Sequence, residues 1–322
     1  MILPRVRLSA RRPIRYCMTV LKNRSSILAF AAIIVLAVLW GSTNVVTKRL
    51  LADQSPASLL AVRFAVATIV LVALLPRVGR IDRATWRDGL VLGLLFAGGQ
   101  LTQTWGLMTT TPAVNAFLSG LYVVITPLLA GLLLARRLEK SVWVAVALSL
   151  VALAAFTVVP GSSAGGFGSG EVLTLVSAVL YAGQILWTGH ATRPERAVQL
   201  AVVQSAVVAV TMGAFALPGG IEVPARASSW LALLYLSLVC GALTLVLQIW
   251  AQVHIDPVRA AIVMCSEPLW TTVFAVAFTG QRMDLALVLG GSLSLAAMLV
   301  VVVPWRPLPR AAIRRVLFAR AA

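Results

Sequence analysis

Two similar stretches, 145 residues apart, decide the fold of this sequence: QTWGLMTTTPAVNAF at 103–117 and QIWAQVHIDPVRAAI at 248–262. Five residues recur at this offset: Gln103, Trp105, Pro112, Ala116 and Arg137 return as Gln248, Trp250, Pro257, Ala261 and Arg282. Each stretch is followed by a proline inside a long apolar segment, Pro127 in the first and Pro268 in the second. Because proline removes a backbone donor and clashes with the preceding turn, we expect both residues to break their helices. The chain is therefore built from two related halves.

The composition outside these stretches is that of a membrane protein. Of the 322 residues, 60% are hydrophobic and only 11% are charged, whereas about a quarter of the residues of a soluble domain are charged. Apolar runs near the length that a helix needs to cross a bilayer recur along the whole chain. The sequence therefore predicts an all-α integral membrane protein without a sizeable soluble domain.

The apolar runs predict ten transmembrane helices, five in each half. We expect them at 27–47, 57–75, 88–108, 112–134, 141–159, 169–189, 197–217, 229–251, 256–279 and 284–304. The expected organisation is a basic tail at 1–26, a first five-helix repeat at 27–160, a linker at 161–168, a second five-helix repeat at 169–304 and a basic tail at 305–322. An odd number of spans places the second half upside down relative to the first. Inverted repeats with interrupted helices are typical of secondary transporters, whose substrate site lies between the repeats near the bilayer midplane.

The positive charges give this topology an orientation. The net charge is +17, and 21 of the 27 lysines and arginines fall on the loops and tails of one side, against four on the other. Since basic residues accumulate on cytoplasmic loops, we expect both termini in the cytoplasm. The same distribution argues against a nucleic-acid partner. The apolar run at 27–46 is long enough to span, so we interpret it as an uncleaved first helix, not a signal peptide.

Ionisable residues inside the expected spans are few, and such residues are functional candidates because they are costly in hydrocarbon. Glu267 lies midway along the ninth span, and Arg63 lies near the start of the second. For Glu267 the sequence leaves several roles open: proton acceptor, partner of a substrate ammonium, counter-ion to an arginine, or a neutral structural acid. Arg63 could contact a substrate carboxylate or extend to the membrane surface.

Amide and aromatic side chains accompany these two residues within the expected spans. Gln100 and Gln103 lie one turn apart and share a helix face. Each such amide could either join two helices or contact a substrate. The residues that we expect to line a central substrate cavity are Trp40, Asn44, Arg63, Gln103, Tyr122, Tyr181, Gln248 and Glu267.

The sequence offers little for catalysis, metals or cofactors. The cysteines Cys17, Cys240 and Cys265 lack paired spacing. The histidines His190 and His254 stand near span ends, outside any metal-ligand motif. A phosphate-binding Gly-x-x-x-x-Gly-Lys loop is also lacking. We therefore expect neither an enzyme nor a bound metal or cofactor, and no ATP-driven pump acting alone.

Several motifs resemble the EamA-type family of the drug/metabolite transporter superfamily. They are LWGSTN at 39–44, Arg63-Phe64, NAFLSGLYVVITPL at 115–128 and SEPL at 266–269. The resemblance implies a fold of two inverted five-helix halves. It also implies export or exchange of small metabolites, often amino acids or amphiphiles, across a bacterial inner membrane, with Trp40, Asn44, Arg63 and Glu267 as the matching positions. The chain departs from the family where Gly280-Gln281 stands in place of Gly-Glu.

Together these features favour a secondary transporter, an exporter that works by alternating access, with Glu267 as the candidate proton-coupling group. The alternative is a flippase for lipids or lipid-linked substrates; an integral membrane enzyme or a receptor fits the residues less well. The expected partners are a small-molecule substrate and the lipid bilayer. The sequence leaves open the substrate, the direction of transport, the coupling ion, the oligomeric state and whether Glu267 is charged.

Overall fold

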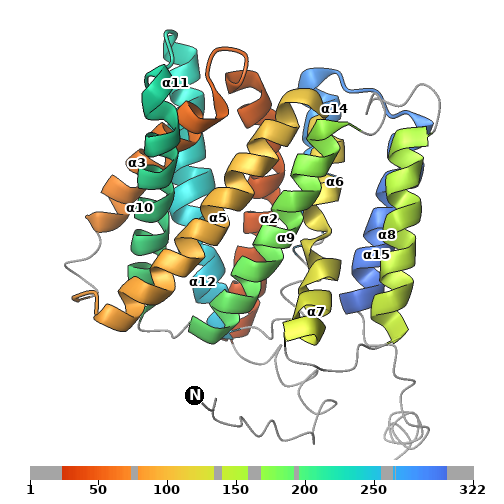
Figure 1. The fold of residues 1–322 in the computed structure, drawn as a ribbon, viewed down its shortest axis with the longest axis horizontal. Coiled ribbons are helices and arrows are strands. Elements are labelled where there is room, and N and C mark those ends of the chain that lie inside the picture. Colours follow the sequence, from red (N-terminus) through yellow and green to blue (C-terminus); the bar gives the residue numbers. More distant parts are fainter. Residues whose placement is uncertain are drawn as a thin grey trace, which may run out of the picture.

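The computed structural model describes residues 24–73, 79–133, 140–158, 168–191, 196–254, 264 and 266–302. Every regular element among these residues is helical, as the composition predicts (Figure 1). The helices are α2 (Arg24–Leu50), α3 (Pro56–Val72), α5 (Arg83–Thr109), α6 (Pro112–Gly120), α7 (Tyr122–Leu133), α8 (Lys140–Val158), α9 (Ser169–Ala191), α10 (Ala197–Ala216), η3 (Leu217–Gly219), α11 (Ala227–Leu234), η4 (Tyr235–Leu243), α12 (Thr244–His254), α14 (Glu267–Thr279) and α15 (Leu285–Val302). Among the features expected from the sequence, Cys17, Arg137, Pro257, Ala261, Cys265 and residues 161–167 of the linker lie outside the described residues.

The bundle has the surface of a membrane protein. Five stretches are long and apolar enough to cross a bilayer: Ile27–Leu50, Pro112–Leu132, Ser169–Thr188, Ala197–Gly219 and Ala227–Gln248. Three shorter apolar helices accompany them, at Pro56–Val72, Lys140–Phe156 and Leu285–Val300. Large apolar side chains such as Ile69, Leu132 and Val210 are at least 70% exposed on the outside. A surface of this kind suits lipid, and the chain is a multi-pass membrane protein.

Short polar turns set the helix ends where the sequence predicts them. Ser55 caps α3 by accepting a hydrogen bond from the amide of Ser58, and Pro56 occupies the first turn. Thr111 caps α6 in the same way through the amide of Val114, followed by Pro112. Side-chain caps satisfy amides that lack a partner in the first turn, where proline costs no hydrogen bond. The boundary expected between the third and fourth spans is thus confirmed.

The interruption of the expected fourth span lies before its proline. The expected fourth span divides at Leu121, where the amide of Val124 bonds the carbonyl of Leu121 in a tighter turn. Pro127 lies inside α7, six residues further along. A proline disturbs the backbone up to four residues before it, so the interruption at Leu121 lies just beyond the turn that Pro127 affects. Pro268 lies in the first turn of α14, directly after Glu267.

Glycines bring the helices into close contact. A Cβ atom at Gly41 of α2 would lie 2.6 Å from the Cβ of Trp270 on α14. Gly89 and Gly93 of α5 face valines of α10 in the same way, and Gly106 of α5 meets the backbone of α9 at Gly170. Small residues allow such close packing of helices in lipid. The outer pair α8 and α15 meets where Gly290 packs on the ring of Phe156.

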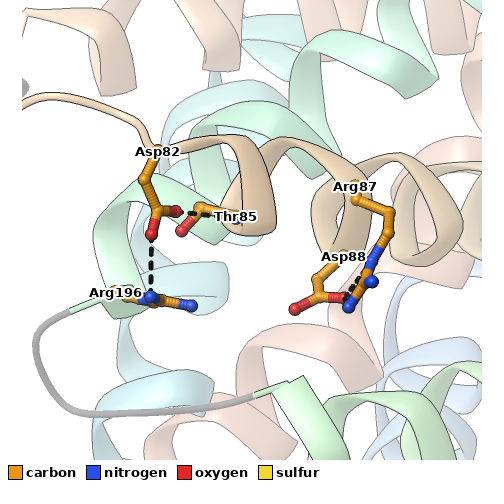
Figure 2. A network of polar contacts seen from close by, with 5 residues as sticks. All are labelled: Asp82, Thr85, Arg87, Asp88 and Arg196. Carbon is orange, nitrogen blue, oxygen red and sulfur yellow. Dashed lines mark hydrogen bonds and ion pairs between the residues drawn. The ribbon is translucent and has the colours of Figure 1, made fainter.

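Polar contacts tie the start of α5 to the start of α10 (Figure 2). Arg196 donates to Asp82 at 2.8 Å, while the other carboxylate oxygen of Asp82 caps α5 by accepting from the amide of Thr85. Beside them, Arg87 pairs with the neighbouring Asp88 at 3.2 Å. The Arg196–Asp82 pair is partly exposed, and pairs of that kind contribute little stability. This end of the bundle is therefore held only weakly by ion pairs among the described residues.

Candidate functional site

A cavity lies at the centre of the bundle, between the two halves of the sequence. Side chains from α2, α3, α5, α6, α7, α9, η4, α12 and α14 line it. All eight side chains that the sequence singles out are among them: Trp40, Asn44, Arg63, Gln103, Tyr122, Tyr181, Gln248 and Glu267. Residues that lie almost 230 positions apart in the sequence, such as Trp40 and Glu267, thus line the same cavity.

Helical periodicity places the lining residues. Along α2 they follow one stripe, Trp40, Thr43, Asn44 and Thr47, at spacings of three to four residues. On α5 the same spacing produces a second stripe, which consists of Phe96, Gln100, Gln103, Thr104 and Leu107. Sequence reasoning missed Thr47, Thr104, Phe96 and Ser119. One more turn along α2 from Asn44 leads to Thr47. One turn along α5 in either direction from Gln100 leads to Thr104 and Phe96.

A hydrogen-bonded chain crosses the cavity wall. Gln100 donates to the hydroxyl of Tyr181 at 2.9 Å, and that hydroxyl donates to Gln103 Oε1 at 2.7 Å. Gln103 Nε2 in turn donates to Ser119 Oγ at 3.1 Å. Gln100 and Gln103 therefore do share a helix face, as their spacing predicts. This series of hydrogen bonds joins α5, α6 and α9, so it fixes the orientation of amide groups at the cavity surface.

Aromatic rings form a continuous row beside this chain. The rings of Phe64 and Phe96 meet edge to face with centroids 5.8 Å apart. Phe96 then contacts Tyr181 at 5.8 Å, and Tyr181 meets Tyr122 edge to face at 6.5 Å. Such pairs add packing energy beyond their buried area. The row gives the cavity an aromatic wall next to its amide groups.

Arg63 is buried and does not extend to the membrane surface. Its side chain is only 4% exposed, and the guanidinium lies 5.3 Å from the ring centre of Phe64. Nε donates to the carbonyl of Leu236 at 3.2 Å, and Nη2 donates to that of Cys240 at 3.4 Å. Both carbonyls belong to η4, a π-helical stretch, and such stretches are frequent at functional sites. Two of the three guanidinium nitrogens are thus bound to backbone.

Glu267 differs from Arg63 in its surroundings. It is the first residue of α14 and lines the cavity. Within the described part of the chain, its carboxylate has no hydrogen-bond or ion-pair partner. The cavity therefore contains one guanidinium held by carbonyls and one carboxylate open to a ligand.

Two other intramembrane amides, Asn115 and Gln204, do not line the cavity. Asn115 is completely buried, and its amide donates to the carbonyl of Gln103 and to the hydroxyls of Thr110 and Thr174. Gln204 is buried in α10, away from the lining. The described residues contain no group of three or more His, Cys, Asp or Glu side chains that could hold a metal ion.

The first prediction concerns the hydroxyl of Tyr181. Tyr181→Phe removes two hydrogen bonds, one from Gln100 Nε2 and one to Gln103 Oε1, whereas Tyr235→Phe removes the hydrogen bond with Ser42 at 2.8 Å. Hydrogen bonds in membranes are worth about 0.6 kcal/mol on average. We expect a lower melting temperature for Tyr181→Phe than for Tyr235→Phe when both are purified in the same detergent. Equal melting temperatures of the two variants would contradict a stabilising role for the hydrogen bonds of Tyr181.

Comparison with known proteins gives three results. A model of the EamA-like transporter family matches residues 27–158 and again residues 168–303. An uncharacterized transporter of Archaeoglobus fulgidus is 27% identical over 265 residues, covering 82% of each chain. The crystal structure of another protein shares the fold with a TM-score of 0.58 at 19% identity, covering 86% of this chain and 94% of the other.

Proposed function

The chain belongs to the EamA-like transporter family, and we propose that it is a secondary active transporter that exports a small metabolite through the central cavity. The observation that carries this proposal is the cavity itself, which combines Glu267, Arg63 and several amides inside an apolar bundle. Polar groups at such a depth are costly unless they bind a partner or line a path. The family and a relative named as a transporter agree with a membrane transporter.

We further propose ten spans in two inverted five-helix halves. Contacts at the helix ends support this inversion. Lys48, near the end of α2, bonds the last carbonyls of α5, while Gly170 at the start of α9 lies against Thr109 at the end of α5. α9 therefore starts at the end of the bundle where α2 finishes, and these equivalent helices run in opposite directions (Figure 1).

Two further pairs of equivalent helices follow the same rule. Glu222, shortly after α10, bonds Gln54 and Ser58 at the start of α3, so α10 finishes where α3 begins. Gln281, shortly after α14, donates to Thr111, the cap of α6, at 3.2 Å. α14 therefore finishes where α6 begins. Reversal of three pairs is what an inverted repeat requires.

The proposed orientation places both termini in the cytoplasm of a bacterial cell, with the protein in the inner membrane. The loops that join α2 to α3 and α10 to α11 then face outward, while those before α5 and α10 face the cytoplasm. The 21-to-4 distribution of basic residues supports this assignment. Export by alternating access would then require the outer end of the cavity to open and close.

The outer end is held by basic side chains of α2. Lys48 Nζ donates to the carbonyls of Leu107, Met108 at 2.8 Å and Thr110 at 3.0 Å. Arg49 donates to the carbonyl of Phe278 at the end of α14. These carbonyls lack partners within their own helices, and cations at helix C-termini are favourable. The contacts join α2 to helices of both halves, so we propose that they form the closed outer gate.

A second prediction follows for Lys48→Met. The change removes three charge-assisted hydrogen bonds, each worth about 1.5–3 kcal/mol, so the outward-open state should become at least about tenfold more populated. The reporter is Thr47→Cys, since Thr47 is buried and lines the cavity, in a chain whose native cysteines are replaced. We expect a membrane-impermeant thiol reagent to label this position faster from outside the cell. Lys140→Met, an exposed change at the start of α8, is the control; equal rates in both variants would contradict the gate.

The proposed transport function is tested by ligand-dependent thermal stability. The detergent-purified protein is screened against amino acids, amines and other small metabolites at two pH values. A ligand that binds only the folded state raises the melting temperature as its concentration exceeds Kd. We expect at least one small metabolite to do so, with a smaller rise when Gln103→Leu alters the lining. Stabilisation by lipids alone would contradict the proposal and favour a lipid flippase.

A further inference from the structure

The two charged groups of the cavity differ in what they can offer a ligand. Nε and Nη2 of Arg63 donate hydrogen bonds to the carbonyls of Leu236 and Cys240, and the residue is 4% exposed. The carboxylate of Glu267 has no hydrogen-bond or ion-pair partner in the portion of the chain that the structure describes. A ligand entering this space therefore meets a carboxyl group that lacks a donor and a positive group whose donors are largely occupied.

The rest of the lining fits an aromatic or apolar body carrying a positive charge. The row Phe64, Phe96, Tyr181 and Tyr122 presents flat rings, and Trp40 lines the same space. The faces of such rings attract cations as well as apolar groups. Amide oxygens of Asn44, Gln103 and Gln248 can accept hydrogen bonds from an ammonium without adding charge.

We propose that the cavity selects monovalent organic cations, namely amines with one aromatic group, whose ammonium binds the carboxylate of Glu267. This inference rests on the proposed transport function and names its substrate class. An ammonium would supply the donor that the carboxylate lacks, and the aromatic group would lie along the row of rings. An anionic ligand would face the unpaired carboxylate and would have to displace the carbonyls from Arg63. A zwitterion would satisfy Glu267 but bring a second carboxylate with the same difficulty.

Three ligands with the same phenyl-ethyl skeleton test this selection: phenethylamine, L-phenylalanine and 3-phenylpropionate. Their dissociation constants are measured with the full-length protein in detergent by thermal shift and by isothermal titration. We expect phenethylamine to bind at least roughly tenfold more tightly than 3-phenylpropionate, since a hydrogen-bonded charge pair is worth about that factor. L-Phenylalanine should fall between them.

Variants assign the selection to Glu267. Glu267→Gln should remove the preference for phenethylamine over 3-phenylpropionate, and Glu267→Asp should retain it. Asp53→Asn removes a carboxylate from an exposed loop and should leave the preference unchanged. Because the wild-type ranking is decisive by itself, the test does not depend on the folding of any variant.

Three outcomes would overturn the inference. They are tighter binding of the anion or the zwitterion than of the amine, no binding of the amine, and an unchanged preference in folded Glu267→Gln. If proteoliposomes containing the protein still accumulate another metabolite, only the substrate class fails and the transport function stands. If they accumulate no metabolite at all, the proposed function itself fails.

Discussion

Glu267→Gln is expected to reduce substrate transport roughly 10- to 100-fold and to abolish its dependence on pH. The substitution preserves the shape of the side chain but removes the only carboxylate among the described lining residues of the cavity. A charge-assisted hydrogen bond to substrate is worth about 1.5–3 kcal/mol, which corresponds to this loss of rate. The fold should survive, because within the described residues no ion pair or hydrogen bond of the structure depends on the carboxylate.

The pH profile separates coupling from simple binding. The other titratable or charged groups that line the described cavity are Arg63 on α3, Tyr122 on α7, Tyr181 on α9 and Cys240 on η4. The measurement is the rate of substrate uptake into vesicles between about pH 5.5 and 8.5. If Glu267 takes up and releases the coupled proton, this rate becomes independent of pH in Glu267→Gln. Asp53→Asn should keep the wild-type profile. A profile that keeps its shape in Glu267→Gln would assign coupling to another group.

Much of this site could be anticipated because its signals are local. The turn Thr111-Pro112 predicts a helix start, and the spacing of Gln100 and Gln103 predicts one shared face. Rare charged residues in apolar spans identify Arg63 and Glu267, and the repeat offset pairs Gln103 with Gln248. The three glutamines, Arg63 and Glu267 all line the central cavity.

Other features depend on distant contacts that local patterns do not contain. The carbonyls that bind Arg63 lie 173 and 177 residues away, and they are placed by a π-helical stretch that no sequence period indicates. The sequence places Lys48 among the loop charges, whereas the structure shows it bound to three carbonyls at the end of α5 and directly after it. The interruption at Leu121 lies six residues before Pro127, so the position of the proline alone does not predict it.

Gly106→Val is expected to cause the largest loss of stability. A Cβ atom at Gly106 would lie 2.3 Å from Thr174 Oγ1 and 2.6 Å from the carbonyl oxygen of Gly170. The hydroxyl can rotate away, but the carbonyl belongs to the backbone of α9, so the two helices must separate. Overpacking costs about 1–3 kcal/mol for side chains that can adjust. A backbone clash should reach or exceed the upper end of this range.

The measurement is the melting temperature of the purified protein, followed by gel-filtration fluorescence. Gly213→Ala is the matched control, because no atom lies within 4 Å of a Cβ placed at Gly213 of α10. We expect the control to melt at or slightly above the wild-type temperature, since alanine favours helices over glycine. Gly106→Val should melt well below wild type or fail to give a monodisperse peak. Similar behaviour of the two variants would contradict the close packing of α5 on α9.

The transport role of the central cavity is tested most directly by counterflow in proteoliposomes. Vesicles containing the purified protein are loaded with unlabelled amines and amino acids, and entry of each labelled compound is followed over time. We expect at least one labelled solute to accumulate transiently, and Ser119→Trp, which fills the cavity from α6, to abolish this accumulation. Movement of labelled lipid between the leaflets without accumulation of any solute, or undiminished accumulation in a folded Ser119→Trp protein, would contradict the account.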